Sequence, residues 1–319
     1  MRLRAALATL CLVLLAARPA AAWPDRPVTL IVPFAAGSAF DIVGRLMVPR
    51  LSASLGQPVV VQNVGGAGGS IGVERAVRAT DGHTLLLSGD AAIVVRPSMT
   101  PPLPYDPQRD LTPILQVAVT PTVLAVPASS PIRTLADLVA AARAQPGSLT
   151  YGHPGPGTSI QIGSEMLRQM ASIELTGVAY TGVPQMMQDL LEGRIAMAFT
   201  QAAVAGPQIR EGRLRVLGVS SARRLDAMPD VPTIAEQGFA GFDVVAWTGF
   251  FAPARTPPAV VEQVARATAE ALADPTVRDR LAGMGTIVTA LGPAEFAALI
   301  AREIPRMGAI VRAANIRAD

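Results

Sequence analysis

The sequence predicts an α/β fold built on mainly parallel sheets, and three observations support this prediction. Short apolar runs rich in β-branched residues alternate with segments of helical period along most of the chain. Such alternation is typical of strand–helix–strand units, in which successive strands lie parallel. Loops of small residues follow several of the predicted strands, and the C-terminal segment has a helical pattern throughout. Residues 23–319 are enough for two modest lobes or one large domain.

The first 22 residues have the composition of a secretory signal peptide. Arg2 and Arg4 precede an apolar core from Ala5 to Ala17, and three alanines precede Trp23, where cleavage is expected. The apolar core is much shorter than the ~20 residues that span a bilayer. The only cysteine, Cys11, lies inside this segment, so the mature chain has no thiol. We therefore expect an exported protein without disulfides, Cys metal ligands or a Cys nucleophile.

The predicted elements follow one another in a regular order after Trp23. The strands are expected at 27–34, 58–63, 83–89, 149–152, 174–180, 195–200 and 214–221. The helices are expected at 41–55, 70–79, 134–144, 158–172, 184–192, 203–211, 257–273, 275–284 and 293–314. Proline should end or kink the first helix at Pro49, interrupt the long apolar run 114–127 at Pro121, and bend the last helix at Pro305.

Charge and motif content argue against most enzyme classes. All 27 basic residues are Arg, which excludes lysine chemistry, and the mature chain has 24 basic and 24 acidic residues. The pI of the whole chain is therefore no argument for nucleic acid. The glycine-rich segments 65–70 and 155–160 fail the dinucleotide spacing, and no nucleophile elbow or zinc motif occurs. His83 is expected in a surface turn, whereas His153 opens a glycine-rich loop. We expect no cofactor and no metal.

Five loops of small residues leave the C-terminal ends of predicted strands. They are PFAAGSAFD (33–41), SGDAA (88–92), GHPGPGTS (152–159), AYTGVP (179–184) and FTQAA (199–203). Ligands of open parallel sheets bind outside those strand ends. Helix N-termini there present unpaired N–H groups and partial positive charge, so they hold a small anion without a basic side chain. The alternative is ordinary strand-to-helix connection with no ligand.

Several longer motifs give the chain a family resemblance. WPDRPVTLIVPFAAG (23–37), LGQPVVVQNVGGAGGSIG (55–72), LPYDPQRDLTPI (103–114), YGHPGPGTS (151–159) and ARRLDAMPDVPTIAEQG (222–238) occur in order. With these motifs the mature chain resembles the Bug-type periplasmic receptors of tripartite tricarboxylate transporters. The resemblance implies a two-lobed periplasmic binding protein with a ligand cleft between the lobes. Lobe 1 would contain 23–122 and 249–319, lobe 2 would contain 123–248, and the lobes would close over the ligand as rigid bodies.

The resemblance also implies how the ligand is held. A carboxylate would bind the backbone N–H groups of the loop after the first strand, with help from Ser and Thr hydroxyls. The residues expected at the ligand are Phe34, Ala35, Ala36, Gly37, Ser38, Asp41, Ser88, Asp90, His153, Thr158, Ser159, Thr181, Thr200 and Gln201. Asp41 has an alternative role in capping the first helix. Gly37 is expected to need a positive φ or a close approach of the anion.

Some positions depart from the usual family pattern and bear on ligand choice. Asp90 stands where Ser, Thr or Gly is usual, Pro156 replaces a common Asn, and Thr200–Gln201 replace a common Asp–Asn. Asp90 would pair with an amino group or repel a second carboxylate if it faces the cleft, and otherwise it would cap a turn. Phe40 and Trp247 would form an apolar wall of the cleft or pack inside a lobe.

The resulting functional prediction is a monomeric receptor that captures a small organic acid in the periplasm. Its partners would be that acid and the membrane subunits of a tripartite tricarboxylate-type transporter, and no nucleic acid. A receptor that feeds a sensor, without its own transporter, has the same sequence pattern. A periplasmic hydrolase or isomerase on a similar fold is disfavoured, because two His and no Cys supply no evident nucleophile–base pair.

Overall fold

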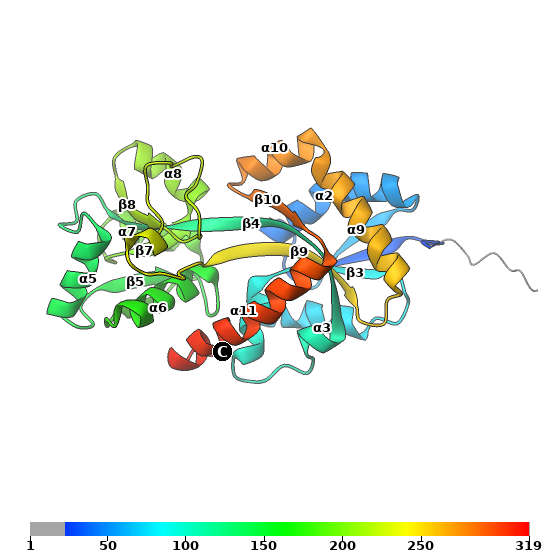
Figure 1. Ribbon diagram of the computed structural model, residues 1–319, viewed down its shortest axis with the longest axis horizontal. Coiled ribbons are helices and arrows are strands. Elements are labelled where there is room, and N and C mark those ends of the chain that lie inside the picture. The colour runs from blue at the N-terminus through cyan, green and yellow to red at the C-terminus, as the bar shows by residue number, and fades with distance from the viewer. Residues whose placement is uncertain (1–22, 319) are drawn as a thin grey trace, which may run out of the picture.

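A computed structural model describes residues 23–318, whose helices and strands form two α/β lobes joined by long strands (Figure 1). This architecture agrees with the fold class that the sequence predicts. The predicted signal peptide lies outside the described residues. Within residues 23–318, none of the helices combines the length and the apolar character that a bilayer crossing requires.

The first lobe is built on one mixed sheet. Its strands, in spatial order, are β10 (Ile287–Leu291), β4 (Leu111–Pro127), β9 (Val245–Pro253), β3 (Thr84–Gly89), β1 (Val28–Val32) and β2 (Val59–Asn63). The strands β2, β1 and β3 run parallel, as the strand–helix alternation predicts. By contrast, β9 pairs antiparallel with β3, and β4 pairs antiparallel with both β9 and β10. The strands β9 and β10 have no counterpart among the predicted strands.

Helices cover both faces of this sheet. Because successive side chains of a strand point to opposite faces, Leu30 and Val32 pack into one buried cluster and Ile31 into the other. The first face is covered by α2 (Ala39–Leu55), α9 (Pro258–Ala273) and α10 (Pro275–Gly283). The second face is covered by α3 (Ser70–Arg78) and α11 (Pro293–Ala313). The sheet is thus buried on both sides, which fits its continuous apolar strands.

The second lobe lies at the left of Figure 1 and surrounds the far half of β4. Here β7 (Ala198–Gln201) and β8 (Leu214–Val219) pair antiparallel with β4, while β5 (Thr150–His153) and β6 (Thr176–Ala179) pair parallel. The helices of this lobe are α5 (Leu135–Ala144), α6 (Ser159–Ala171), α7 (Val183–Leu191) and α8 (Ala202–Arg210). The short helix α4 (Pro107–Asp110) lies directly before β4.

The strand β4 belongs to both lobes, contrary to the predicted break at Pro121. Its first part pairs with β9 as far as Pro121, which lies opposite Val245. From Thr122 onward its partners are β7 and β8. Pro121 has no N–H group to donate to a neighbouring strand. It lies where the pairing with β9 ends and the pairing with β7 and β8 begins, so the missing hydrogen bond is tolerated there.

Two further local features differ from the predictions. The helix α2 does not end at Pro49 but continues to Leu55, with Pro49 on its exposed side. Water can bond the carbonyl that proline leaves unpaired, while Met47 and Leu51 stay buried against the sheet. His83 is buried rather than exposed, because Trp23 packs beside its ring and its Nε2 lies 2.9 Å from Oδ1 of Asp25.

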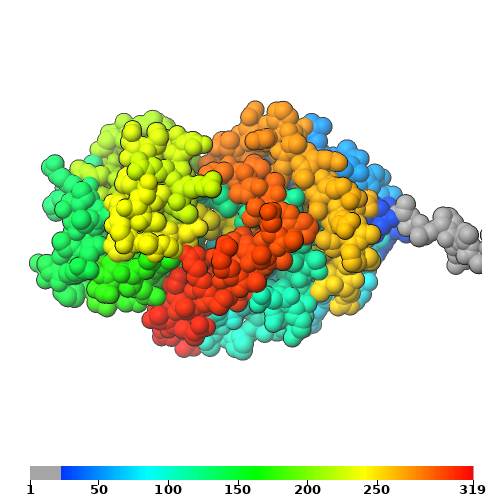
Figure 2. Space-filling view, viewed as in Figure 1, coloured from blue at the N-terminus to red at the C-terminus, as the bar shows by residue number. Residues whose placement is uncertain are grey.

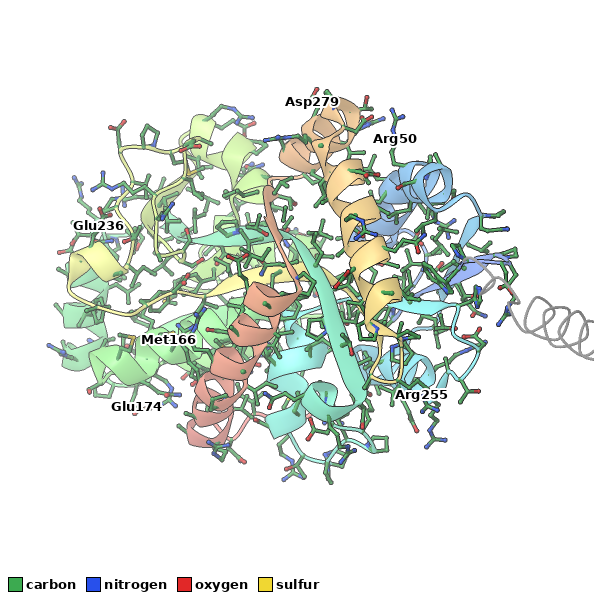
Figure 3. All side chains as sticks on the ribbon, turned by 45° about the vertical axis from the view of Figure 1, so that its right-hand side comes forward. Arg50, Met166, Glu174, Glu236, Arg255 and Asp279 are labelled. Atoms are coloured by element: carbon green, nitrogen blue, oxygen red, sulfur yellow. The ribbon has the colours of Figure 1, made fainter. Side chains whose placement is uncertain are left out.

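The last helix makes a third connection between the lobes. It follows β10 in the first lobe, and its C-terminal half reaches the second lobe. Arg306 donates to the carbonyl of Asp243 at 2.6 Å and contacts Sδ of Met166 at 3.6 Å. Figure 3 labels Met166 on α6, next to α11. The predicted helix 293–314 is confirmed, and Pro305 lies inside it.

Candidate functional site

The loop after β1 is held in shape by its own side chains. Ser38 is the N-cap of α2 and accepts from the N–H of Asp41 at 3.3 Å. Gly37 has a φ of +82°, which confirms the expected left-handed conformation. Its N–H donates to Oδ2 of Asp41 at 2.8 Å. The loop is therefore folded back onto the first turn of the helix.

The buried side chain of Asp41 holds this loop in place through hydrogen bonds. Besides Gly37, its carboxylate accepts from Nε of Arg45 at 2.9 Å and from Nδ2 of Asn63 at 2.9 Å. The hydrogen bond from Arg45, together with those from Gly37 and Asn63, lowers the pKa of Asp41 to about 2 although burial opposes this. Asp41 thus stays ionised with its acceptor sites used inside its own lobe. The N-cap of α2 is Ser38 and not Asp41, which lies in the first turn of the helix and holds the loop through the N–H of Gly37.

The other backbone groups of the loop are available to a ligand. Ala35, Ala36 and Gly37 are exposed. Among the hydrogen bonds of residues 23–318, none uses the N–H of Ala35 or Ala36. Phe34 is half-buried and stacks on Phe40 with ring centroids 4.4 Å apart, which gives the loop an apolar support. Two neighbouring N–H groups at a helix N-terminus can bind one small anion.

Asp90 lies buried at the end of β3 and faces a cavity of about 180 Å³ between the lobes. Its Oδ1 accepts from the N–H of Trp247 at 3.3 Å. Burial raises the pKa of Asp90 to about 7, and the charge of Glu303 adds to this rise. Ser159 lines the same cavity, so two of the predicted site residues, one from each lobe, meet there. Asp90 therefore does not cap a turn toward solvent.

The sequence did not identify several residues of this cavity. Besides Asp90 and Ser159, its polar lining consists of Gln116, Asp243, Arg302, Glu303 and Arg306. In α11, the lining positions 299, 302, 303, 306 and 307 recur at helical spacing, so charged residues lie on the same stripe as apolar ones. Charged residues within an otherwise apolar helical stripe are the sequence pattern that could have identified these cavity residues.

Two predicted hydroxyl groups are buried without a partner. Oγ of Ser88 in β3 and Oγ1 of Thr200 in β7 are fully buried and make no hydrogen bond. Because a buried hydroxyl without a partner costs roughly 1–3 kcal/mol, such groups in native proteins usually have a role. The two residues come from different lobes, and each lies near the C-terminal end of its strand.

The loop after β5 repeats the design of the loop after β1. Thr158 is the N-cap of α6, accepts from the N–H of Gln161 at 3.4 Å and donates to the carbonyl of Gly155 at 3.0 Å. His153 is buried, and the centroid of its ring lies 5.9 Å from that of Tyr151. Its Nδ1 atom has no hydrogen-bond partner. Burial lowers the pKa of His153, which favours a neutral imidazole. His153 therefore supplies shape and a hydrogen-bonding atom instead of a charge.

Thr181 and Gln201 are the remaining predicted site residues. Thr181 is exposed and its hydroxyl lies 3.2 Å from Oε1 of Gln185. Gln201 lines a small cavity of about 90 Å³ with Phe40 and Trp247. Trp247 is itself buried and packs edge-on against Phe296 with ring centroids 5.1 Å apart, so it has both the packing role and a place in the cavity walls.

The surface between the lobes is hollowed. Figure 2 shows a depression between the second lobe and the segments α10, β10 and α11. A groove of about 500 Å³ there is lined by residues of α8 and of 282–287. Residues 23–318 contain no group of three or more His, Cys, Asp or Glu side chains arranged to hold a metal ion.

Comparisons with known proteins identify the family and agree with the fold. Residues 43–316 match the model of the tripartite tricarboxylate transporter family receptor. The chain is 34% identical to BugT of Bordetella pertussis over 292 residues, covering 91% of this chain and 90% of BugT. MatC of Rhodopseudomonas palustris, solved with bound malate, is 33% identical with a TM-score of 0.75, covering 91% of this chain and 100% of MatC. Another R. palustris protein, solved with adipate, is 31% identical with a TM-score of 0.77, covering 92% and 99%.

Proposed function

This chain belongs to the tripartite tricarboxylate transporter receptor family, and we propose that it captures a small organic acid in the cleft between its lobes. The observation that carries the proposal is the loop after β1, whose exposed N–H groups at Ala35 and Ala36 precede a helix N-terminus. Malate and adipate, found in the similar R. palustris structures, are both carboxylates.

We further propose that one carboxylate of the ligand binds the loop of Phe34, Ala35, Ala36, Gly37 and Ser38. Thr158 and Ser159 approach from the second lobe, where α6 presents its own N-terminus. We propose that the ligand also engages the hydroxyls of Ser88 and Thr200 and Nδ1 of His153, which are buried and have no hydrogen-bond partner. Neutral dipoles bind an anion more weakly than a buried ion pair would, which suits a receptor that must release its ligand.

The site and its surroundings favour binding over catalysis, and the family is one of periplasmic receptors. We propose that the protein works in the periplasm after removal of residues 1–22. As a monomer, it would then deliver its ligand to the membrane subunits of a tripartite tricarboxylate-type transporter.

The ligand is expected to stay bound through a gentle purification, because a closed cleft retains solute. Native mass spectrometry of the exported protein should show an added mass that is released on denaturation and fragments as a carboxylic acid. The mass of bound adipate or malate serves as calibration when each is added to the stripped protein. Retention of a compound with no carboxylate, or of one that the protein chemically converts, would contradict the proposed function.

The lobe boundaries at 122/123 and 248/249 remain a proposal, and closure tests them. Ligand that contacts both lobes favours the conformation in which they approach. Small-angle scattering should therefore show a smaller radius of gyration at saturating ligand than without it. Stripped protein with an equal concentration of sodium chloride is the control. An unchanged radius at proven saturation would argue against hinged lobes.

A further inference from the structure

Arg96 is a buried cation without an acidic partner. It follows a short helical turn, Ala91–Val95, whose last four residues are buried, and Arg96 itself is only 8% exposed. Among residues 23–318 no carboxylate lies within 4 Å of its guanidinium. Nη1 donates to the carbonyl of Pro101 at 2.8 Å, whereas Nε is buried and has no acceptor. A guanidinium stays charged, so burying one without a counter-charge is costly.

The neighbouring side chains do not supply this counter-charge. The charge of Arg96 acts on the pKa of Tyr105, but burial raises that pKa, so the phenol stays neutral. The hydroxyl of Tyr105 is buried and has no hydrogen-bond partner. The charge of Glu74 also acts on the pKa of Tyr105, yet the carboxylate of Glu74 is already paired with Arg78 at 2.6 Å on α3. The described side chains around Arg96 therefore leave its charge uncompensated.

A cavity of about 120 Å³ lies against Arg96. This volume is well above the roughly 10–15 Å³ that a single water molecule needs. Within residues 23–318, Arg96 contributes the only charged side chain of the lining, and the other lining residues are alanine, glycine, proline and methionine. They come from the loop before α3, the turn after β3, the loop after β5 and the segment after α11. The cavity is therefore large enough for a small ion and has a single cation in an otherwise uncharged wall.

The chemistry of this wall selects a small monovalent anion. One guanidinium balances one negative charge, and a doubly charged anion would carry an uncompensated charge into the buried wall. A carboxylate has several lone-pair positions that need donors, but the lining side chains other than Arg96 have no N–H or O–H group. The backbone N–H of Gly157 is also in use, since it donates to Oε1 of Gln161 at 2.8 Å. A halide ion makes no such directional demand, so a single guanidinium is sufficient for it.

We propose that Arg96 holds a chloride ion, at a site separate from that of the organic solute. The ion supplies the counter-charge that the guanidinium lacks. Nη2, which makes no hydrogen bond within residues 23–318, is the donor left for it. Because Pro156 and Gly157 belong to the second lobe, the ion also connects the loop after β5 to the first lobe at this point. The inference does not depend on the identity of the solute.

Chloride should stabilise the protein through Arg96, because a ligand that binds only the native state raises the free energy of unfolding. Protein stripped of solute is compared in chloride-free buffer and in chloride at about tenfold its dissociation constant. The melting temperature of the wild type should rise by about 2–4 °C more than that of Arg96→Gln. The chloride NMR line, which broadens when the ion exchanges with a protein site, should be broader with the wild type than with Arg96→Gln. Arg96→Lys should keep part of both effects.

Arg143→Gln is the matched control, because Arg143 also donates to a single backbone carbonyl, that of Ala171, and does not line the cavity. It should respond to chloride as the wild type does, so general salt effects are common to both. Ala318→Glu tests the site from the opposite direction, since Ala318 lines the cavity and the new carboxylate would replace the ion. This variant should melt at a higher temperature than the wild type without chloride and should gain less from added chloride.

The inference is overturned if the wild type and Arg96→Gln respond equally to chloride, or if Ala318→Glu keeps the full response of the wild type. It is also overturned if the solute that the protein retains returns the chloride line to its free width, since Arg96 would then belong to the solute site. The chloride response is measured without any organic acid, so its failure leaves the proposed function intact.

Discussion

Gly37→Val is expected to weaken ligand binding by about 100-fold or more while the protein still folds. At a φ of +82° a β-branched side chain is strongly disfavoured, so the loop must leave its present path. A Cβ atom at this position would meet no atom within 4 Å, so the expected effect comes from the backbone conformation. Movement of Gly37 displaces the N–H groups of Ala35 and Ala36, on which the proposed carboxylate contact depends. Calorimetry with the ligand found by mass spectrometry measures the loss.

Gly56→Val is the control for strain alone. Gly56 ends the same helix with a φ of +71°, and again nothing lies within 4 Å of the added carbon. Both variants should lose a similar 1–2 kcal/mol of unfolding free energy, on the order expected for a side chain forced to positive φ. Only Gly37→Val should lose binding. Equal affinity in the two variants would show that the loop after β1 does not hold the anion.

Asp90→Asn is expected to stabilise the protein at pH 8 but not at pH 5. The folded protein holds the proton of Asp90 up to a pKa of about 7, whereas an unfolded Asp releases it near 3.8. Between these values the native state binds more protons than the unfolded state, so stability falls as pH rises. The full difference corresponds to about 4 kcal/mol, which the uncharged asparagine would recover above pH 7. The other charged residues that line the cavity of Asp90 are Asp243, Arg302, Glu303 and Arg306.

Urea unfolding of both proteins at pH 5 and pH 8 measures this effect. The difference in unfolding free energy between variant and wild type should grow in favour of Asp90→Asn from pH 5 to pH 8. Asp279→Asn, on the exposed surface labelled in Figure 3, should leave the pH dependence unchanged. If Asp90→Asn is no more stable than the wild type at pH 8, Asp90 is ionised at neutral pH and held by partners that offset its burial.

The elements of this fold were largely predictable, because local pattern determines them. The apolar run before Pro33 and the small residues after it correctly located β1, its loop and α2. The positive φ of Gly37 was also predictable, since a tight turn into a helix N-terminus requires it. The strands β9 and β10 were not predicted.

The pairing of distant segments was not predictable in this way. That β4 continues through Pro121 depends on its partners β9, β7 and β8, which periodicity does not reveal. Side-chain burial was equally hidden. Asp90 had two opposed interpretations in the sequence, and no pattern distinguished Glu303 from the other charged residues of the last helix. Their chemical interest arises only because the fold removes both from water.

The position of β9 between β3 and β4 governs the order in which this protein can be completed. Leu86 of β3 pairs with Phe251 of β9, and the whole second lobe lies between these residues in the chain. A chain that emerges N-terminus first presents β1, β2 and β3 as a half-sheet whose apolar edge has no partner until β9 arrives. Long-range pairing of this kind is slow and leaves the waiting edge open to other chains. The nascent protein is therefore most vulnerable to aggregation before β9 is released, and a factor that shields the β3 edge would act in that interval.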